Sequence, residues 1–220
     1  IYKGKTFRIE AEITKLVVKI SDFKNQESFE HNARRIIFPY VKNNGTVSLI
    51  EERVLKERYP GAYKYLLEAR EELQTRDKGK AVHPNWYAYA RTQGLNYCGK
   101  KLLTPTFSKN PRFLFEKDPA SLFCNGYAIF EKNCQGQLFD NNKIDLSVLR
   151  KILNSIIMHY YVTKTSVSIE GGYPCYQKNF IELFGIPDFA KGELEFLKKI
   201  NDSSEIDKFL LGKYGIMLED

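Results

Sequence analysis

The residues whose types and spacing best suit chemistry are basic side chains interleaved with aromatic rings between Arg76 and Lys117. This segment carries nine Lys or Arg against two acids, and its surplus of seven equals the formal net charge of +7 of the 220-residue chain. Lysine and arginine neutralise phosphates, amide and arginine side chains read base edges, and aromatic rings pack on sugars or displaced bases. A polyanion, with nucleic acid first, is therefore the expected partner.

Individual residues of this segment divide into two groups. Short polar loops between expected elements favour a binding role for Lys78, Lys80, Arg91, Lys109 and Arg112. Large aromatic residues are more often core residues, and a lysine run is usually a solvated face. A structural role is therefore favoured for Trp86, Phe107, Phe113, Phe115, Lys100 and Lys101.

Patterns of catalytic residues are incomplete. Asp188 followed by Glu193 and Glu195 resembles the carboxylate cluster of a metal-dependent nuclease, but a glutamate stands where that pattern has a lysine. Asn110-Pro111-Arg112-Phe113 resembles the Asn-Pro-Pro-aromatic motif of amino-methyltransferases and breaks it at the third position. The Gly171-Gly172 pair does not open a helix, as a phosphate- or cofactor-binding turn would. This chain alone is expected to hold no catalytic residues and no cofactor.

Metal, membrane and targeting signals are also missing from the sequence. The four cysteines form no CxxC pair, and no histidine lies at i, i+4 from another histidine or a cysteine, so no metal site is expected. The densest apolar segment, residues 144–162, is interrupted by charged residues and does not predict a membrane span. We expect a soluble, cytoplasmic chain. Because it opens at Ile1 with no initiator methionine and no leader, we also expect a piece of a longer protein.

The N-terminal part of the chain predicts strands followed by helices. Apolar and polar residues alternate over residues 7–13, and residues 36–38 form a second short apolar run that stops at a proline, so both predict strands. Asn43-Asn44-Gly45 predicts a turn. Ser48 with Glu51 forms a capping box that predicts a helix to about residue 58, and a second helix is expected from residue 60 to about 75.

The rest of the chain predicts a small sheet and further helices. After a loop over residues 77–84 and a short helix over Trp86 to Gln93, mostly antiparallel strands are expected at residues 102–107, 112–115 and 127–130. One long helix is expected from its cap at Asp145 to about residue 162, and a turn follows at the glycine pair. Terminal helices are expected at residues 193–200 and 206–214. The fold class is therefore α+β, with a small, mostly antiparallel mixed sheet and several packed helices.

Four ordered motifs resemble a known family. They are Tyr59-Pro60-Gly61-Ala62-Tyr63-Lys64-Tyr65-Leu66, Arg76-Asp77-Lys78-Gly79-Lys80, Trp86-Tyr87-Ala88-Tyr89-Ala90-Arg91-Thr92-Gln93 and Ser108-Lys109-Asn110-Pro111-Arg112-Phe113. Together they resemble the TaqI-like C-terminal specificity domain, the target-recognition part of N6-adenine DNA methyltransferases and of fused type II restriction-modification enzymes. The resemblance extends from about residue 34 to residue 187.

The resemblance implies a DNA-binding domain over residues 1–187, with residues 188–220 as a helical segment packed on it or appended to it. The DNA-binding residues it implies are Lys78, Lys80, Trp86, Tyr87, Tyr89, Arg91, Gln93, Lys109, Asn110 and Arg112. Which of them reads a base, contacts the backbone or supports a loop stays open.

The partners implied by the resemblance are double-stranded DNA and an N-terminal methyltransferase domain that this chain lacks. That missing domain would bind S-adenosylmethionine and methylate a flipped adenine, so the chain alone is expected to be non-catalytic. Two alternatives from other classes stay open. One is a self-sufficient nuclease that uses Asp188, Glu193 and Glu195, and the other is a protein-interaction module that binds through its terminal helices.

Overall fold

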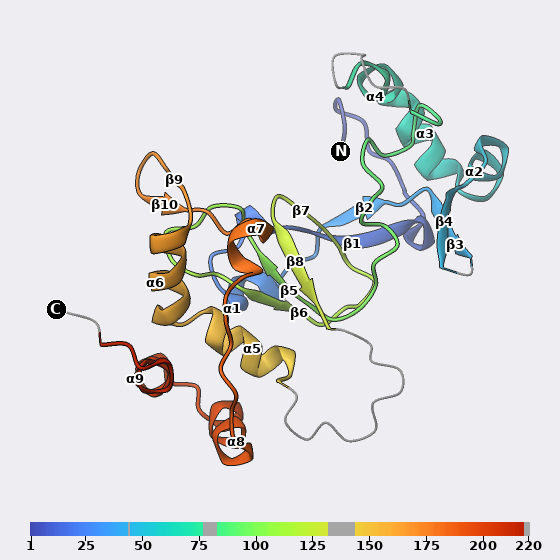
Figure 1. The fold of residues 1–220 in the computed structure, drawn as a ribbon. Helices are drawn as coiled ribbons and strands as arrows, with labels where there is room; N and C mark the ends of the chain where they lie inside the picture. The colour runs from blue at the N-terminus through green and yellow to red at the C-terminus, as the bar shows by residue number, and fades with distance from the viewer. Residues whose placement is uncertain (44, 77–82, 132–143, 218–220) are drawn as a thin grey trace. The chain divides into compact units, whose positions relative to one another are not determined.

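The chain has an α+β fold of small, mostly antiparallel sheets and several helices, seen in a computed structural model that describes residues 1–43, 45–76, 83–131 and 144–217 (Figure 1). It divides into two compact units. The first consists of Ile1–Val17, Ala33–Cys98 and Ala120–Leu122, and the second of Val18–Asn32, Gly99–Pro119 and Phe123–Asp220. The helical segment expected from residue 188 onward lies within the second unit.

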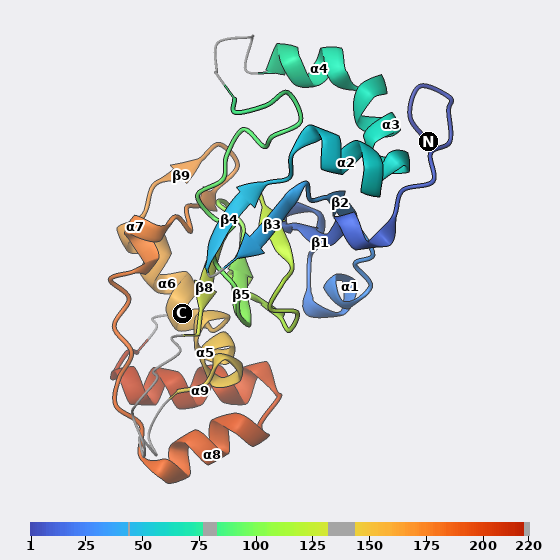
Figure 2. The ribbon, with the colours of Figure 1, turned by 90° about the vertical axis from the view of Figure 1, so that its right-hand side faces the viewer.

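The first unit combines short strand pairs with three consecutive helices. Its elements are η1 (Ala11–Ile13), β1 (Thr14–Lys19), β2 (Arg35–Ile37), β3 (Tyr40–Asn43), β4 (Thr46–Leu49), α2 (Glu52–Arg58), α3 (Pro60–Glu68) and α4 (Arg70–Thr75). Strand β1 runs antiparallel to β2, and its last two residues belong to the second unit. Strands β3 and β4 form a separate antiparallel hairpin with Val41 opposite Ser48, and Figure 2 shows the two side by side.

The core of the first unit lies beneath α2 and α3. Its buried members come from η1, both helices, the residue after β4 and the segment after α4, and they are Ile13, Ile50, Leu55, Ala62, Leu66 and Tyr87. Apolar side chains recurring at helical spacing on α3 supply two of them, as the sequence predicts.

The second unit is built on the antiparallel sheet β6-β5-β8. Its elements are η2 (Ile20–Asp22), α1 (Gln26–Glu30), β5 (Lys101–Thr104), β6 (Leu114–Glu116), β8 (Tyr127–Phe130), α5 (Leu146–Leu153), α6 (Ile156–Thr165), β9 (Ser168–Ile169), β10 (Tyr173–Pro174), α7 (Lys178–Ile181), α8 (Lys191–Lys199) and α9 (Ser203–Tyr214). Strand β7 (Leu122–Cys124) belongs to the sheet β2-β1-β7, and the boundary between the two units falls after its first residue. Leu102 of β5 lies opposite Phe115 on one side and Ile129 on the other. The three strands and their antiparallel pairing agree with the prediction.

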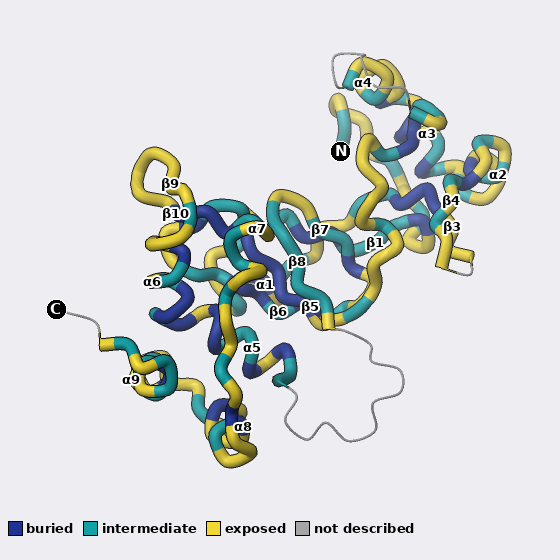
Figure 3. Tube along the Cα trace, viewed as in Figure 1, coloured by how far each residue is buried: buried dark blue, intermediate teal, exposed yellow. Residues whose placement is uncertain are grey.

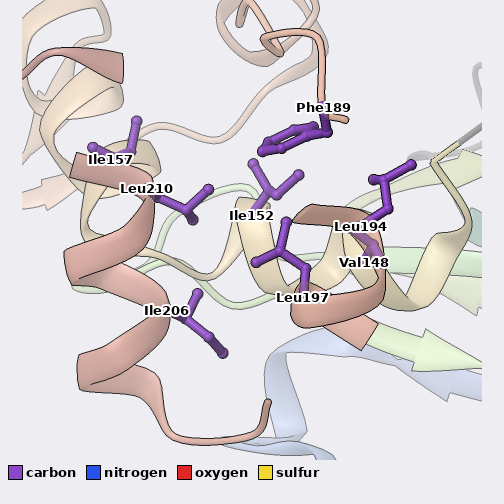
Figure 4. Packing of buried hydrophobic residues seen from close by; sticks show 8 residues of the cluster. All are labelled: Val148, Ile152, Ile157, Phe189, Leu194, Leu197, Ile206 and Leu210. Atoms are coloured by element: carbon purple, nitrogen blue, oxygen red, sulfur yellow. The ribbon is translucent and has the colours of Figure 1, made fainter. Parts of the chain in front are cut away.

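The two C-terminal helices pack within the second unit. Figure 4 shows side chains of α8 and α9 meeting those of α5 and α6 in one buried cluster, whose members are Val148, Ile152, Ile157, Phe189, Leu194, Leu197, Ile206 and Leu210. The Lys151 ammonium donates to the carbonyl oxygens of Leu197 (2.7 Å), Lys198 (3.0 Å) and Ile200, at the end of α8. The Lys151 ammonium thus bonds carbonyl groups that have no partner within the last turn of α8. Because Lys151 lies in α5, these hydrogen bonds link α8 to α5.

Several predicted elements differ in the structure. Residues 7–13 form no strand, since the Glu10 carboxylate caps α3 instead. Ser48 lies in β4 rather than capping a helix, and α2 begins four residues later. Residues 86–93 form turns, bends and irregular chain in place of a helix. The helix expected over residues 60–75 breaks into α3 and α4 at residue 69, and the helix expected from Asp145 breaks into α5 and α6 at residues 154–155. The Asp145 cap itself is present, accepting from the N–H groups of Ser147 and Val148.

Candidate nucleic-acid interface

Two tyrosines hold the segment that follows α4 in the first unit. The Tyr87 hydroxyl donates to the carbonyl of Ile50 (2.6 Å), and the Tyr89 hydroxyl donates to that of Ile37 (2.5 Å). The Tyr89 N–H donates to the hydroxyl of Tyr40 (2.6 Å). Burial raises the pKa of Tyr87 to about 12 and also raises the pKa of Tyr89. Both tyrosines thus remain neutral anchors of the backbone, and the DNA contact that the resemblance implies for them stays a prediction.

Trp86 also makes hydrogen-bond and ring contacts that hold this segment. Its indole N–H donates to the Glu52 carboxylate (3.2 Å), and its ring meets Tyr87 edge-on at a centroid distance of 5.2 Å. The guanidinium of Arg70 lies 5.1 Å from the centre of the indole ring, within the range of a cation–π contact. Trp86 therefore supports the segment, as its residue type favours, and its contact with DNA stays a prediction.

Exposed polar residues follow these anchors, and one of them is hydrogen-bonded to the β3–β4 hairpin. Arg91 and Gln93 are exposed, and the Lys42 ammonium of β3 donates to the carbonyl of Asn96 (3.1 Å). Lys42 and Asn43 are exposed, and Figure 3 shows exposed chain at the end of the β3–β4 hairpin. We call Lys42, Asn43, Arg91, Gln93 and Asn96 the hairpin–loop surface. One hydrogen bond joins its two segments, between residues that are 54 positions apart in sequence.

Sequence reasoning identified Arg91 and Gln93, which belong to a matched motif, as binding residues. It predicted a turn at Asn43-Asn44-Gly45 but assigned no binding role to it. Lys42 lies between that turn and the strand predicted at residues 36–38, outside the basic segment. The signal that could have found it is the pair of asparagines and the glycine after Lys42, which predict an exposed hairpin end. Tyr97 is also 67% exposed next to this surface, and the sequence indicates it only as one of the aromatic residues of the basic segment.

The positive charge belongs mainly to the first unit. Its described residues hold 14 Lys or Arg against 8 Asp or Glu, a surplus of six, whereas those of the second unit hold 16 against 15, a surplus of one. The basic segment of the sequence is divided between the two units at residue 98. One of its lysines, Lys101, is buried and donates to the carbonyls of Gly99 (3.2 Å) and Asp118 (3.0 Å), in line with a structural role.

The other motif with expected DNA contacts lies in the second unit, between β5 and β6. Lys109 and Asn110 are exposed there, and Arg112 is partly buried. The loop ends at Phe113, whose N–H and carbonyl are both bonded to the side-chain amide of Asn154 at 2.8 and 2.9 Å. Asn154 thus fixes the end of this loop on the break between α5 and α6.

Arg112 has an incompletely satisfied guanidinium. Its Nε is buried and has no hydrogen-bond partner among the described residues, and burial lowers the pKa of the side chain. Two expected contacts, Lys78 and Lys80, lie outside the described residues.

Glu193 and the glycine pair, which belong to patterns that resemble catalytic sites, make other contacts in the structure. Both oxygens of the Glu193 carboxylate accept from the ammonium of Lys213, at 2.9 and 2.8 Å, and one of them also accepts from the N–H of Ala190 at the start of α8. Within the described ranges, no three His, Cys, Asp or Glu side chains are grouped so that they could hold a metal ion. Gly171 and Gly172, with φ of 86° and 72°, turn the chain from β9 into β10, so this pair does not fit the cofactor turn that joins a strand to a helix.

Comparison with known proteins leaves the family open, since no protein-family model and no curated protein matches the chain. None of the helices among the described residues is long and apolar enough to cross a membrane.

Proposed function

We propose that this chain is the target-recognition part of a type II N6-adenine DNA methyltransferase or of a fused restriction-modification enzyme. The observation that carries the proposal is the hairpin–loop surface, where the exposed Lys42 of the hairpin is hydrogen-bonded to the loop that carries exposed Arg91 and Gln93, in the unit that holds most of the positive charge. The four ordered motifs point to the same class of protein.

The chemistry of the hairpin–loop surface fits duplex DNA. A two-stranded β-ribbon is narrow enough to enter the major groove, and β3–β4 is a two-stranded hairpin. Lys42 and Arg91 carry the charge that phosphates attract, while Asn43 and Gln93 carry the amide group that pairs with adenine. Tyr87 and Tyr89 hold the segment in place through their hydroxyl hydrogen bonds, which lowers the entropy lost on binding.

Methyl transfer would come from a separate domain that binds S-adenosylmethionine. The motif at Asn110 lacks the second proline of the methyltransferase motif, and the glycine pair joins two strands. The role proposed for this chain is therefore to grip and read the duplex.

The test is a fluorescence anisotropy titration of labelled duplex DNA at several salt concentrations. We expect weak binding, with a Kd of roughly 10⁻⁴ to 10⁻⁶ M at physiological salt, because the chain without a catalytic domain closes only one side of the duplex. The double variant Lys42→Ala, Arg91→Ala should bind more weakly and lower the log–log salt slope by about 0.9 for each phosphate that is no longer neutralised.

The matched control is Lys178→Ala, which removes an exposed positive charge from the second unit. It should leave the salt slope unchanged. Absence of binding at low salt, or equal weakening in the control, would count against the hairpin–loop surface. Calorimetry that shows a stoichiometric S-adenosylmethionine complex of this chain would overturn the target-recognition assignment.

A further inference from the structure

The first unit contains a cavity that the DNA-binding proposal does not use. Its volume is about 400 Å³, within the range of small-molecule sites. The residues that line it come from the segment before η1, from β2, α3 and α4, and from the tyrosine-anchored segment. The cavity therefore lies among elements that one compact unit holds together.

The walls are apolar and aromatic. Aliphatic side chains such as Ile9, Leu66 and Leu73 line it together with the rings of Tyr87 and Tyr89. Both of these hydroxyls already donate to backbone carbonyls, so the tyrosines offer ring surface rather than free donors. Such walls suit a planar, largely apolar ligand.

The charged groups of the lining are both arginines. Arg35 is held in place by Thr14, whose hydroxyl and carbonyl accept from its Nε (2.7 Å) and Nη2 (3.2 Å). Arg76 donates from Nη2 to the carbonyl of Trp86 (3.4 Å), while its Nε is buried with no hydrogen-bond partner in the described residues. No acidic side chain of the described ranges lines the cavity. The buried Nε of Arg76 is a donor without a partner, and it lies on a cavity whose charged lining residues are all positive. This combination indicates that an anionic acceptor binds there.

We propose that this cavity binds a small organic anion made of a planar apolar ring and one anionic group. The anionic group accepts from the guanidinium of Arg76, Arg35 adds positive potential, and the ring packs against the tyrosines and aliphatic residues. The proposal is independent of the DNA-binding role, since no residue of the hairpin–loop surface lines the cavity.

The experiment is isothermal titration calorimetry of the full chain with three matched probes. Naphthalene-2-sulfonate carries the ring and the anion, naphthalene-2-sulfonamide the ring alone, and methanesulfonate the anion alone. We expect saturable one-site binding of the first probe and binding at least about tenfold weaker for the other two, because a charge-assisted hydrogen bond and ring burial each contribute that much. Equal affinity for all three, or no saturable binding of the first, would overturn the proposal.

Variants separate the arginine from general charge. Arg76→Gln should weaken naphthalene-2-sulfonate binding about tenfold or more. Arg76→Lys, which keeps the charge but not the Nε donor, should recover only part of the affinity. The control Arg53→Gln removes a charge of α2 outside the cavity and should bind as the unaltered chain does. Circular dichroism establishes that each variant is folded, and unchanged affinity in folded Arg76→Gln would refute the site.

Discussion

The Glu10 carboxylate accepts a hydrogen bond from the backbone N–H of Gly61 at 2.8 Å, and its second oxygen accepts from the N–H of Ala62 at 3.0 Å. These N–H groups lie in the first turn of α3, where the helix itself offers them no partner. A residue 51 positions away in sequence thus serves as the helix cap, and its negative charge also suits the positive end of the helix dipole.

Replacing Glu10 should therefore destabilise the first unit in a pH-dependent way. Burial raises the pKa of Glu10, but the N–H groups of Gly61, of Glu10 itself and of Ala62 outweigh it, so the pKa lies below its ordinary value. We expect Glu10→Gln to lower the free energy of unfolding by about 1 kcal/mol at neutral pH.

The effect should be complete above the ordinary glutamate pKa of about 4.3 and should shrink as the pH falls through the lower pKa of the folded state. Urea unfolding at pH 7 and pH 3 measures both values. Exposed Glu12 provides the control, since Glu12→Gln should leave the free energy of unfolding unchanged at both pH values. A Glu10→Gln loss that stays constant with pH would show that the charge is not involved.

Gly61→Ala tests how closely the same segment approaches α3. A Cβ on Gly61 would lie 1.9 Å from the carbonyl oxygen of Arg8, which is backbone and cannot turn away. The expected cost exceeds about 2 kcal/mol, typical of overpacking. Gly212→Ala in α9 is the matched control, because nothing lies within 4 Å of its Cβ, and it should stabilise the chain by roughly 0.4–1 kcal/mol. Equal effects of the two substitutions in thermal unfolding would contradict the close approach.

The contact between Glu10 and α3 is a feature that the sequence pattern does not predict. The alternation over residues 7–13 is a valid strand pattern, and Pro60 correctly predicts the first turn of a helix. Nothing local connects the two, so a carboxylate that looks like the polar face of a strand becomes the cap of a distant helix. A local signal is confirmed at Asp145, which caps the helix that it begins.

The candidate site also combines residues that a local motif predicts with a residue whose role depends on a distant contact. The basic and amide residue types of Arg91 and Gln93 and their exposed positions follow from a loop motif, whereas the contribution of Lys42 depends on a hydrogen bond to Asn96 that no pattern encodes. Aromatic residues such as Tyr87 are expected from the sequence both in the core and at the interface. The buried hydrogen bond from Tyr87 to the Ile50 carbonyl shows that this tyrosine supports the core, and no sequence pattern predicts that bond.

Asn154 should be essential for the position of the loop that ends at Phe113. Its amide supplies one acceptor and one donor to the buried backbone there. We expect Asn154→Ala to cost about 1–2 kcal/mol in urea unfolding, because it leaves two backbone groups without a partner. Asn154→Asp keeps the acceptor for the Phe113 N–H but brings a carboxylate to the carbonyl, so at neutral pH it should not rescue stability. Rescue by aspartate would show that the N–H contact alone matters.

Tyr87 should make the chain sensitive to alkaline pH. Its pKa of about 12 in the folded chain exceeds the ordinary tyrosine value of about 10, so the unfolded chain loses this proton first. The stabilisation is complete below pH 10 and decreases as the pH rises towards 12, by about 1 kcal/mol at pH 11. Urea unfolding at pH 9 and pH 11 should show a larger loss for the unaltered chain than for Tyr87→Phe. Equal losses would place the titrating group elsewhere.

Arg112 separates binding from folding. Its buried Nε has no partner among the described residues, so Arg112→Met, which keeps the apolar stem and removes the unsatisfied group, should change the free energy of unfolding by less than about 1 kcal/mol. If Arg112 contacts DNA, the same substitution should weaken duplex binding by about 1–3 kcal/mol. Exposed Lys109, three residues earlier in the same loop, is the comparison: Lys109→Met should weaken binding less and lower the salt slope by about 0.9. A large drop in melting temperature for Arg112→Met with unchanged DNA affinity would make Arg112 a structural residue and remove it from the interface.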